Sequence, residues 1–176
     1  NLLDFTAPPV CLGNSSVFTS QITNSFNTII NNYTWSFGDA TTGSTANTTH
    51  TYTAANSYTA KLLLDYGNNC ADSVSKTVVV NDNPVASFTV ADVCNSNTVQ
   101  PVNNSTVSSG SNTYSWNFGD ATASVAGQNP SHIYQQSNTY SIRLIATSGA
   151  GCADTVSNPV NVIIGTVIDF TAPPVC

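Results

Sequence analysis

The stretch Tyr33-Thr-Trp-Ser-Phe-Gly-Asp39 decides the fold, because it returns further along the chain as Tyr114-Ser-Trp-Asn-Phe-Gly-Asp120. The residues that follow each copy also match, and their shared order is His-x-Tyr and then Cys-Ala-Asp. They are His50, Tyr52 and Cys70 in the first copy and His132, Tyr134 and Cys152 in the second. The chain is therefore a tandem repeat. A side chain that occurs once per repeat has its counterpart about one domain length away along the sequence. Paired catalytic groups are hard to build in such a chain.

A second, longer period joins the two ends of the sequence. Asp4-Phe-Thr-Ala-Pro-Pro-Val-Cys11 recurs letter for letter as Asp169-Phe-Thr-Ala-Pro-Pro-Val-Cys176. We therefore expect repeat 1 at residues 1–82, repeat 2 at 83–165 and the first strand of a further copy at 166–176. This pattern predicts that the two-domain block belongs to a longer array.

The composition excludes several classes of partner. Only 7% of the residues are charged, the net charge is −6, and the basic residues are Lys61, Lys76 and Arg143. Three dispersed cations cannot neutralise a nucleic-acid backbone or bind an anionic membrane surface strongly. No apolar run approaches the roughly 20 residues that span a bilayer. We expect an exported segment with no nucleic-acid partner and no membrane insertion.

The local sequence pattern is that of β-strands. Residues 57–64 and 139–146 alternate between outward and inward side chains, and residues 74–80 and 156–164 are rich in β-branched ones. Asn, Ser, Thr and Gly fill the intervals and favour turns, because they bond their own backbone or tolerate positive φ. Short strands at close spacing predict an all-β fold of two tandem antiparallel sandwiches.

The order Trp-x-Phe-Gly-Asp, His-x-Tyr, Ser/Thr-Tyr-x-x-x-Leu and Val-x-Val resembles the polycystic kidney disease (PKD) domain, an immunoglobulin-like β-sandwich. The resemblance covers both repeats almost end to end. The cysteine-bearing form looks like the PKD repeats of large secreted and surface proteins of Bacteroidota-type bacteria. The sequence departs from the family at Ala40 and Ala121, where the family usually has Gly, and this difference predicts a slightly different turn.

The repeated aromatic and acidic residues have predicted structural roles. Four aromatic residues occupy inward-facing strand positions and are expected in the cores. They are Trp35, Phe37, Trp116 and Phe118. Asp39 and Asp120 follow Phe-Gly at a strand end, where a carboxylate can accept backbone N–H bonds and fix a turn. Calcium binding is the alternative, but no cluster of acids lies nearby in sequence to supply six to eight oxygens, so we expect no metal site.

His50 and His132 raise the question of catalysis, because His is a common base and metal ligand. Neither has a second His or a Cys-x-x-Cys motif beside it, and the chain has no Gly-x-Ser-x-Gly elbow. In the PKD family that the chain resembles, this His belongs to the turn before the Tyr. We expect no catalytic activity and no cofactor.

Five cysteines without metal-ligand spacing indicate disulfides in an oxidising compartment. Sequence spacing favours pairs within each repeat, Cys11 with Cys70 and Cys94 with Cys152, which leaves Cys176 for a following copy. In an immunoglobulin-like strand order, however, Cys11 and Cys70 lie at opposite ends of a sandwich, whereas bridgeable Cα atoms lie within about 7 Å. A head-to-tail arrangement of domains then favours Cys11 with Cys152. Both pairings stay open at the level of sequence.

Covalent glycans are a further expectation for an exported chain. Five Asn-x-Ser/Thr sequons begin at Asn14, Asn32, Asn47, Asn103 and Asn104. Ser73 and Thr155 each follow Asp and precede Val, which resembles the Asp-Ser/Thr-aliphatic motif for O-glycosylation in Bacteroidota. We hypothesise that Ser73 and Thr155 carry glycans that hinder edge-to-edge association. The alternative is that both residues simply begin strands and were selected for β propensity.

The sequence as a whole predicts an extracellular structural repeat protein, a stalk or filament whose partners are copies of itself. The short connector at residues 81–84 favours semi-rigid coupling of neighbouring domains. One alternative is an accessory module that binds carbohydrate beside a secreted enzyme. Another is an adhesin with its site in the irregular stretches 40–49 or 95–111.

Overall fold

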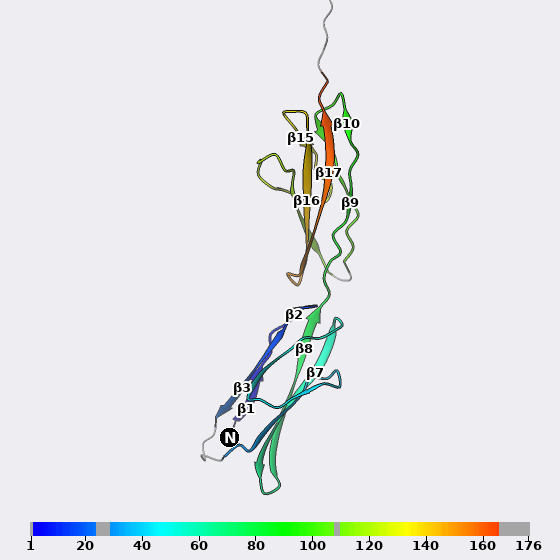
Figure 1. The fold of residues 1–176 in the computed structure, drawn as a ribbon. Coiled ribbons are helices and arrows are strands. Elements are labelled where there is room, and N and C mark those ends of the chain that lie inside the picture. Colours follow the sequence, from blue (N-terminus) through cyan, green and yellow to red (C-terminus); the bar gives the residue numbers. More distant parts are fainter. Residues whose placement is uncertain (1, 24–28, 108–109, 166–176) are drawn as a thin grey trace, which may run out of the picture. The chain divides into compact units, whose positions relative to one another are not determined.

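The structure, a computed structural model, describes residues 2–23, 29–107 and 110–165 (Figure 1). Every regular element in these residues is a β-strand, which confirms the all-β prediction. The chain divides into two compact units, unit 1 at residues 1–83 and unit 2 at residues 84–176. The predicted first strand of a further repeat at 166–176 lies outside the described residues. The described part contains no helix suited to crossing a membrane.

Unit 1 consists of two sheets. The first has the order β1 (Leu2–Thr6), β3 (Ser16–Thr23) and β6 (Asn47–His50). The second has the order β2 (Val10–Cys11), β8 (Cys70–Asn81), β7 (Asn56–Gly67), β4 (Asn32–Ser36) and β5 (Thr42–Gly43). All neighbours are antiparallel except β2 and β8, which are parallel. An early strand of the domain is therefore paired with its last strand.

Unit 2 repeats this plan with shorter elements in its first sheet. Its larger sheet has the order β10 (Val93–Cys94), β17 (Ala153–Ile163), β16 (Asn138–Ser148), β13 (Asn112–Asn117) and β14 (Val125–Ala126). β10 and β17 are parallel, as β2 and β8 are. The other sheet is reduced to two pairs, β9 (Phe88–Thr89) with β12 (Val102–Asn103) and β11 (Thr98–Val99) with β15 (His132–Ile133).

A proline explains why the first sheet of unit 2 is divided. Cys94 aligns with Cys11, so Pro101 takes the place that Phe18 has in the middle of β3. Proline has no N–H to donate to a ladder, and pairing stops at Val99 and resumes at Val102. Pro101 is buried, as Phe18 is. The core position is kept while the continuity of the strand is lost.

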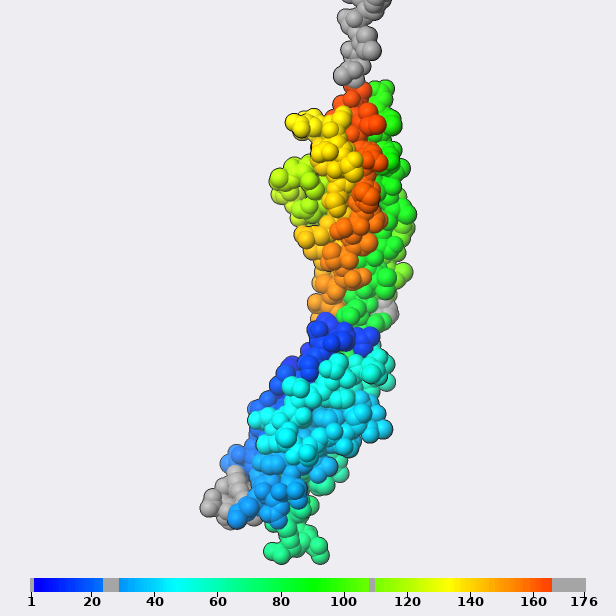
Figure 2. All heavy atoms as spheres, in the orientation of Figure 1, coloured from blue at the N-terminus to red at the C-terminus, as the bar shows by residue number. Residues whose placement is uncertain are grey.

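A long hairpin is the main element of each larger sheet. In unit 1, β7 and β8 pair from Asn56 opposite Val80 to Gly67 opposite Cys70, with an irregularity between Asp65 and Gly67. Ala60, Leu62 and Leu64 point inward and are fully buried. The turn of this hairpin projects from unit 1 at the end away from β2 (Figures 1 and 2).

The core of each unit is built around one tryptophan. Trp35 on β4 and Trp116 on β13 have no exposed surface. Phe5 meets the Trp35 indole edge-on at 5.1 Å between ring centroids, and Phe88 meets Trp116 in the same way at 5.0 Å. Because Phe5 and Phe88 come from the opposite sheet, these contacts hold the two layers together.

A side chain from the last strand also ties the two sheets at one edge. The Lys76 ammonium on β8 donates to the Phe5 carbonyl on β1 at 2.7 Å and pairs with the Asp4 carboxylate at 2.6 Å. In unit 2, the Asn158 amide donates to the Phe88 carbonyl at 3.0 Å. Two different side chains thus make the same bond between the sheets.

Candidate functional site

The repeated Phe-Gly-Asp segment forms a tight turn after β4 and after β13. Gly38 has φ +87°, and a Cβ there would lie 2.7 Å from the Thr59 carbonyl oxygen on β7. Gly119 has φ +78°, and its Cβ would lie 2.6 Å from the Ser141 carbonyl oxygen on β16. Any side chain at these positions would push the turn away from the sheet. The motif therefore requires glycine at both places.

The turn residues Ala40 and Ala121 have positive φ angles of 71° and 65°. This left-handed conformation costs an L-residue with a Cβ roughly 1–2 kcal/mol, whereas glycine adopts it readily. The backbone thus explains why glycine suits the position after the Asp. The turn is kept in both units despite the alanine.

Each turn is closed by three side chains that we call the aspartate clasp: Asp39, Thr41 and His50 in unit 1, and Asp120, Thr122 and His132 in unit 2. The Thr41 backbone N–H and hydroxyl donate to Asp39 Oδ1 at 3.1 and 2.5 Å, and His50 Nε2 lies 2.6 Å from Asp39 Oδ2. The distances in unit 2 are 3.2, 2.6 and 2.7 Å. Because an ionised carboxylate only accepts, the ring hydrogen is assigned to Nε2.

These contacts fix the charge state of the carboxylates. Burial alone would raise the pKa of Asp39, but the hydrogen bonds from Thr41 and His50 outweigh it and hold the pKa below the usual value. The same balance lowers the pKa of Asp120. Both groups are therefore ionised acceptors at neutral pH, and each joins the strand-end turn to the segment that carries the His.

The histidine rings are held by aromatic neighbours. His50 stacks on Phe37 with 4.3 Å between ring centroids and meets Tyr52 edge-on at 4.5 Å. The Tyr52 hydroxyl donates to the Phe37 carbonyl at 2.8 Å, and burial raises the pKa of Tyr52 to about 12. Tyr52 in turn stacks on Tyr58 at 4.0 Å.

We call these successive rings, Phe37, His50, Tyr52 and Tyr58, the column of rings. Unit 2 has the same column, formed by Phe118, His132, Tyr134 and Tyr140. Burial raises the pKa of Tyr134 as well. The Tyr134 hydroxyl donates to the Phe118 carbonyl at 2.8 Å. The same polar and aromatic contacts thus fix the same turn twice in one chain.

The aspartate clasp contains a hydroxyl, an imidazole and a carboxylate, but their arrangement differs from that of a nucleophile with its base. In a catalytic triad the hydroxyl and the acid bond different ring nitrogens. Here Asp39 and Thr41 both face Nε2 of His50, at 2.6 and 3.3 Å, and the Thr41 hydroxyl donates to the carboxylate. The clasp fixes a turn and leaves no base free to activate the hydroxyl.

The described residues contain no group of three or more His, Cys, Asp or Glu side chains that could hold a metal ion. Both oxygens of Asp39 already accept hydrogen bonds from Thr41 and His50. The geometry of the clasp therefore favours the turn over the calcium alternative.

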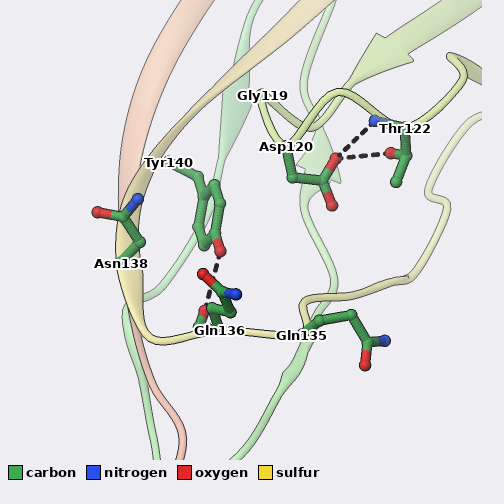
Figure 3. A pocket seen from close by; sticks show the side chains of 7 residues that line it. All are labelled: Gly119, Asp120, Thr122, Gln135, Gln136, Asn138 and Tyr140. Carbon is green, nitrogen blue, oxygen red and sulfur yellow. Dashed lines mark hydrogen bonds between the residues drawn. The ribbon is translucent and has the colours of Figure 1, made fainter.

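A polar pocket of about 430 Å³ lies beside the clasp of unit 2 (Figure 3). Its lining combines a carboxylate, a hydroxyl, three amide side chains and a tyrosine, and the lining residues are Gly119, Asp120, Thr122, Gln135, Gln136, Asn138 and Tyr140. The Tyr140 hydroxyl donates to the Gln136 carbonyl at 2.9 Å. Unit 1 has Thr53 and Ala54 at the positions of Gln135 and Gln136, so these two amides are specific to unit 2.

The state of the cysteines contradicts one of the two predicted disulfide pairings. Cys70 and Cys94 are free and exposed, so pairing within each repeat, Cys11 with Cys70 and Cys94 with Cys152, is wrong. The reason is the length of β8, which begins at Cys70 and ends at Asn81, the ladder neighbour of Cys11. The 11 steps from Cys70 to Asn81 span roughly 36 Å at about 3.3 Å per residue. That exceeds the disulfide limit of about 7 Å. Cys11 and Cys152, which form the other predicted pair, are each disulfide-bonded, and Cys176 lies outside the described residues.

Most of the proposed glycan acceptors lie on the surface. Ser73 on β8 and Thr155 on β17 are exposed, as are Asn14, Asn32, Asn47 and Asn104. Asn103 differs, because its amide nitrogen is buried and its carbonyl oxygen accepts the Ser105 N–H at 2.9 Å. A glycan on Asn103 is incompatible with this fold, so that prediction is corrected.

Sequence reasoning missed several residues of these sites. Thr41 and Thr122 each donate two of the three hydrogen bonds to the carboxylate of their clasp, and the repeated Asp-Ala-Thr signals them. Gln135 and Gln136 stand out only when the two repeats are compared position by position. The bond from Lys76 to Phe5 joins residues 71 apart and has no local signal.

Two immunoglobulin-like β-sandwiches in tandem, each closed by an aspartate clasp, define the class of this chain. The PKD domain family matches it twice, over residues 3–80 and 81–164. The chain belongs to the PKD domain family. PKD domains are non-catalytic modules, and membership indicates an extracellular adhesion or binding module.

Several solved structures are similar. The chain is 26% identical to the PKD1 domain of Vibrio anguillarum Epp, over 48% of this chain and 99% of that chain, with a TM-score of 0.44. It is 28% identical to the PKD1 domain of the Vibrio cholerae metalloprotease PrtV, over 46% and 98%, with a TM-score of 0.42. Fibronectin(III)-like modules of Clostridium thermocellum CbhA are 12% identical over 98% and 100%, with a TM-score of 0.49. No curated protein sequence matches the chain.

Replacing Ala40 or Ala121 by glycine should stabilise the protein. The positive φ of these residues disfavours alanine, and removal of the Cβ should raise the free energy of unfolding by about 1 kcal/mol per site. Urea unfolding of Ala40→Gly and Ala121→Gly measures this. Ala71→Gly, at an exposed position of β8, is the control and should lower stability by about 0.5–1 kcal/mol, because the φ of Ala71 is not positive. Equal destabilisation by all three variants would contradict the explanation.

The aspartate clasps should make stability fall in acid. A free Asp has a pKa of about 3.9, and the folded pKa values of Asp39 and Asp120 are lower. Their contribution is therefore complete above about pH 4 and is lost as pH falls through the folded pKa. Asp39→Asn with Asp120→Asn should cost about 1 kcal/mol per domain at pH 7 and give a shallower acid transition.

Urea midpoints measured from pH 7 to pH 2 test this prediction. Asp82→Asn, which changes an exposed carboxylate beyond β8, is the control and should keep the wild-type profile. If the double variant also keeps the wild-type stability and slope, the clasps do not carry the acid response.

Proposed function

We propose that this protein is an extracellular structural repeat protein whose tandem PKD domains build a surface stalk or filament, with copies of itself as partners. The observation that carries the proposal is the parallel pairing of β2 with β8 and of β10 with β17. In each unit, this pairing attaches an early strand to the last one. Force that pulls the two ends of a domain apart then loads these hydrogen bonds in shear, along the strands, where they must break together.

Further contacts strengthen the same connection in unit 1. The Leu12 N–H donates to the Asn81 carbonyl at 2.8 Å, and the Asn83 amide donates to the Leu12 carbonyl at 3.0 Å. Lys76 ties β8 to the Phe5 carbonyl on β1. A domain whose entering and leaving segments are bonded to each other suits a load-bearing array.

The repeated sequence supports an array as well. Asp4 to Cys11 and Asp169 to Cys176 are identical, and a polymer needs equivalent contacts at a constant interval. Family membership and the disulfide-bonded cysteines are typical of extracellular proteins. The exposed Ser73 and Thr155 are the preferred acceptors for glycans that would keep strand edges of neighbouring copies apart.

Electron microscopy of the native material tests the proposal. We expect filaments or stalks with a repeat that corresponds to the two-domain block, and density for glycans beyond Ser73 and Thr155. Intact mass spectrometry should give a mass above that of the polypeptide. Dispersed single particles would contradict the filament, and a bare polypeptide mass would reject the glycans while leaving the filament standing.

The pocket of unit 2 favours a second function, carbohydrate binding by an adhesin or accessory module. Gln135, Gln136 and Asn138 offer donors and acceptors beside the Asp120 carboxylate, which suits a neutral polyhydroxylated ligand. The corresponding Thr53 and Ala54 of unit 1 lack these amides. This alternative therefore assigns the binding to unit 2.

Titration with neutral oligosaccharides, followed by amide chemical shifts, tests this second function. Gln135→Ala with Gln136→Ala should weaken any binding at least tenfold, because the lost amides leave ligand hydroxyls without partners. Thr53→Ala in unit 1 is the matched control and should bind as the wild type does. Chemical shift changes located outside the unit 2 pocket, or equal binding by the double variant, would contradict carbohydrate binding at this pocket.

A further inference from the structure

The cysteines of the described residues fall into two positional classes. Edge cysteines, Cys11 and Cys94, lie in the short strands β2 and β10. Turn cysteines, Cys70 and Cys152, lie at the hairpin turns before Ala71 and Ala153 in the repeated Cys-Ala-Asp. One member of each class, Cys11 and Cys152, is disulfide-bonded, whereas Cys94 and Cys70 are free. The free thiols are thus the repeat equivalents of the bonded ones.

The two edge cysteines have the same backbone environment. Cys11 is paired with Asn81 in a parallel ladder, and the next residue donates its N–H to the Asn81 carbonyl at 2.8 Å. Cys94 is paired with Ile163 in the same way, and the next N–H donates to the Ile163 carbonyl, also at 2.8 Å. Cys94 is therefore held in the arrangement in which Cys11 forms a disulfide.

The turn cysteines occupy the same position of the repeat. Cys70 lies opposite Gly67 across a turn whose central residues, Asn68 and Asn69, have φ 51° and 59°. Cys152 follows Gly151, which has φ +84°, and its carbonyl accepts the Ser148 N–H at 2.8 Å. Both cysteines lie at hairpin turns, where the bonded Cys152 is buried and the free Cys70 is exposed.

Neither free thiol can pair with the other cysteine of its own unit. Cys70 and Cys11 are separated by the length of β8, roughly 36 Å, and Cys94 and Cys152 by that of β17, whose 11 residues span roughly 33 Å. The disulfide-bonded cysteines are one edge cysteine, Cys11, and one turn cysteine, Cys152. The free cysteines are likewise one edge cysteine, Cys94, and one turn cysteine, Cys70. We propose that Cys94 of one copy of this two-domain block forms a disulfide with Cys70 of another copy.

This inference deepens the proposed function, on which it rests, because it names the residues that join successive blocks covalently. The chemistry needs an oxidant, which a small-molecule disulfide such as oxidised glutathione supplies. The Cys94 thiolate attacks one glutathione sulfur, forms a mixed disulfide and releases one glutathione thiolate. The Cys70 thiolate of the second copy then attacks the Cys94 sulfur and releases the second glutathione. The two cysteine protons end on the two glutathione thiols.

Complementary single-thiol variants test the pairing. Cys176→Ser is included throughout, so that Cys70 and Cys94 are the thiols compared. One variant adds Cys70→Ser and retains Cys94, and the other adds Cys94→Ser and retains Cys70. Each variant alone, and an equimolar mixture, is incubated with oxidised and reduced glutathione and separated on a non-reducing gel. Tryptic mapping without reduction identifies the linked peptides.

We expect the mixture to form a heterodimer in clear excess over the half that random pairing would give, linked by Cys94 and Cys70 and dissociated by reductant. Each variant alone should remain mostly monomeric. Homodimers at the random share, or only glutathione-capped monomers, would overturn the inference. Unchanged β-sheet circular dichroism, together with Cys11 and Cys152 protected from alkylation, controls for folding.

The same measurements separate this inference from the filament itself. Native filaments without a peptide linking Cys94 to Cys70 would retain the proposed function and reject the covalent junction. If the variants form the heterodimer but the native material shows no filaments, the pairing of Cys94 with Cys70 stands and the proposed filament function is rejected.

Discussion

Each domain depends on one indole buried between its two sheets. Trp35 packs opposite Leu62 of its own sheet and edge-on against Phe5 of the other, and its ring N–H donates to the Thr45 carbonyl in a loop at 2.8 Å. The indole therefore fixes the two layers and a connecting segment at once. Phe37 follows two residues later on the same face, and it brings the turn with Asp39 into place. Trp116 has the same role in unit 2.

Much of this could be predicted, because the relevant signals are local. Alternation places Trp35 inward, and the apolar positions of the β7–β8 and β16–β17 hairpins mark their inner faces. Long-range choices were less accessible. Sequence spacing favoured a disulfide between Cys11 and Cys70 because it takes no account of the extended strand β8, whose length separates the two residues. The loss of a continuous strand at Pro101 had a visible cause, but its effect depends on which neighbour the strand would have joined.

The two units show which features of this sandwich vary and which persist. Phe18 is replaced by Pro101, and the Lys76 contact to Phe5 by the Asn158 contact to Phe88. The aspartate clasp and the column of rings are kept. The conserved contacts all hold the turn after the tryptophan strand, whereas the amide-lined pocket occurs where the units differ. The pocket shares Asp120, Thr122 and Tyr140 with these stabilising contacts. The amides of Gln135 and Gln136 are what distinguish it from unit 1.

The length of β8 has a consequence for how the protein responds to stretching. The strand runs extended from Cys70 to Asn81, and the main chain leaves the domain directly after it. Once Cys70 is cross-linked, the covalent path through unit 1 contains only this strand, which already has nearly its full contour length. The other residues of the domain then lie off the path as a side loop. Unfolding of the rest of the sandwich would then add almost no length to the covalent path, so the chain would still resist extension.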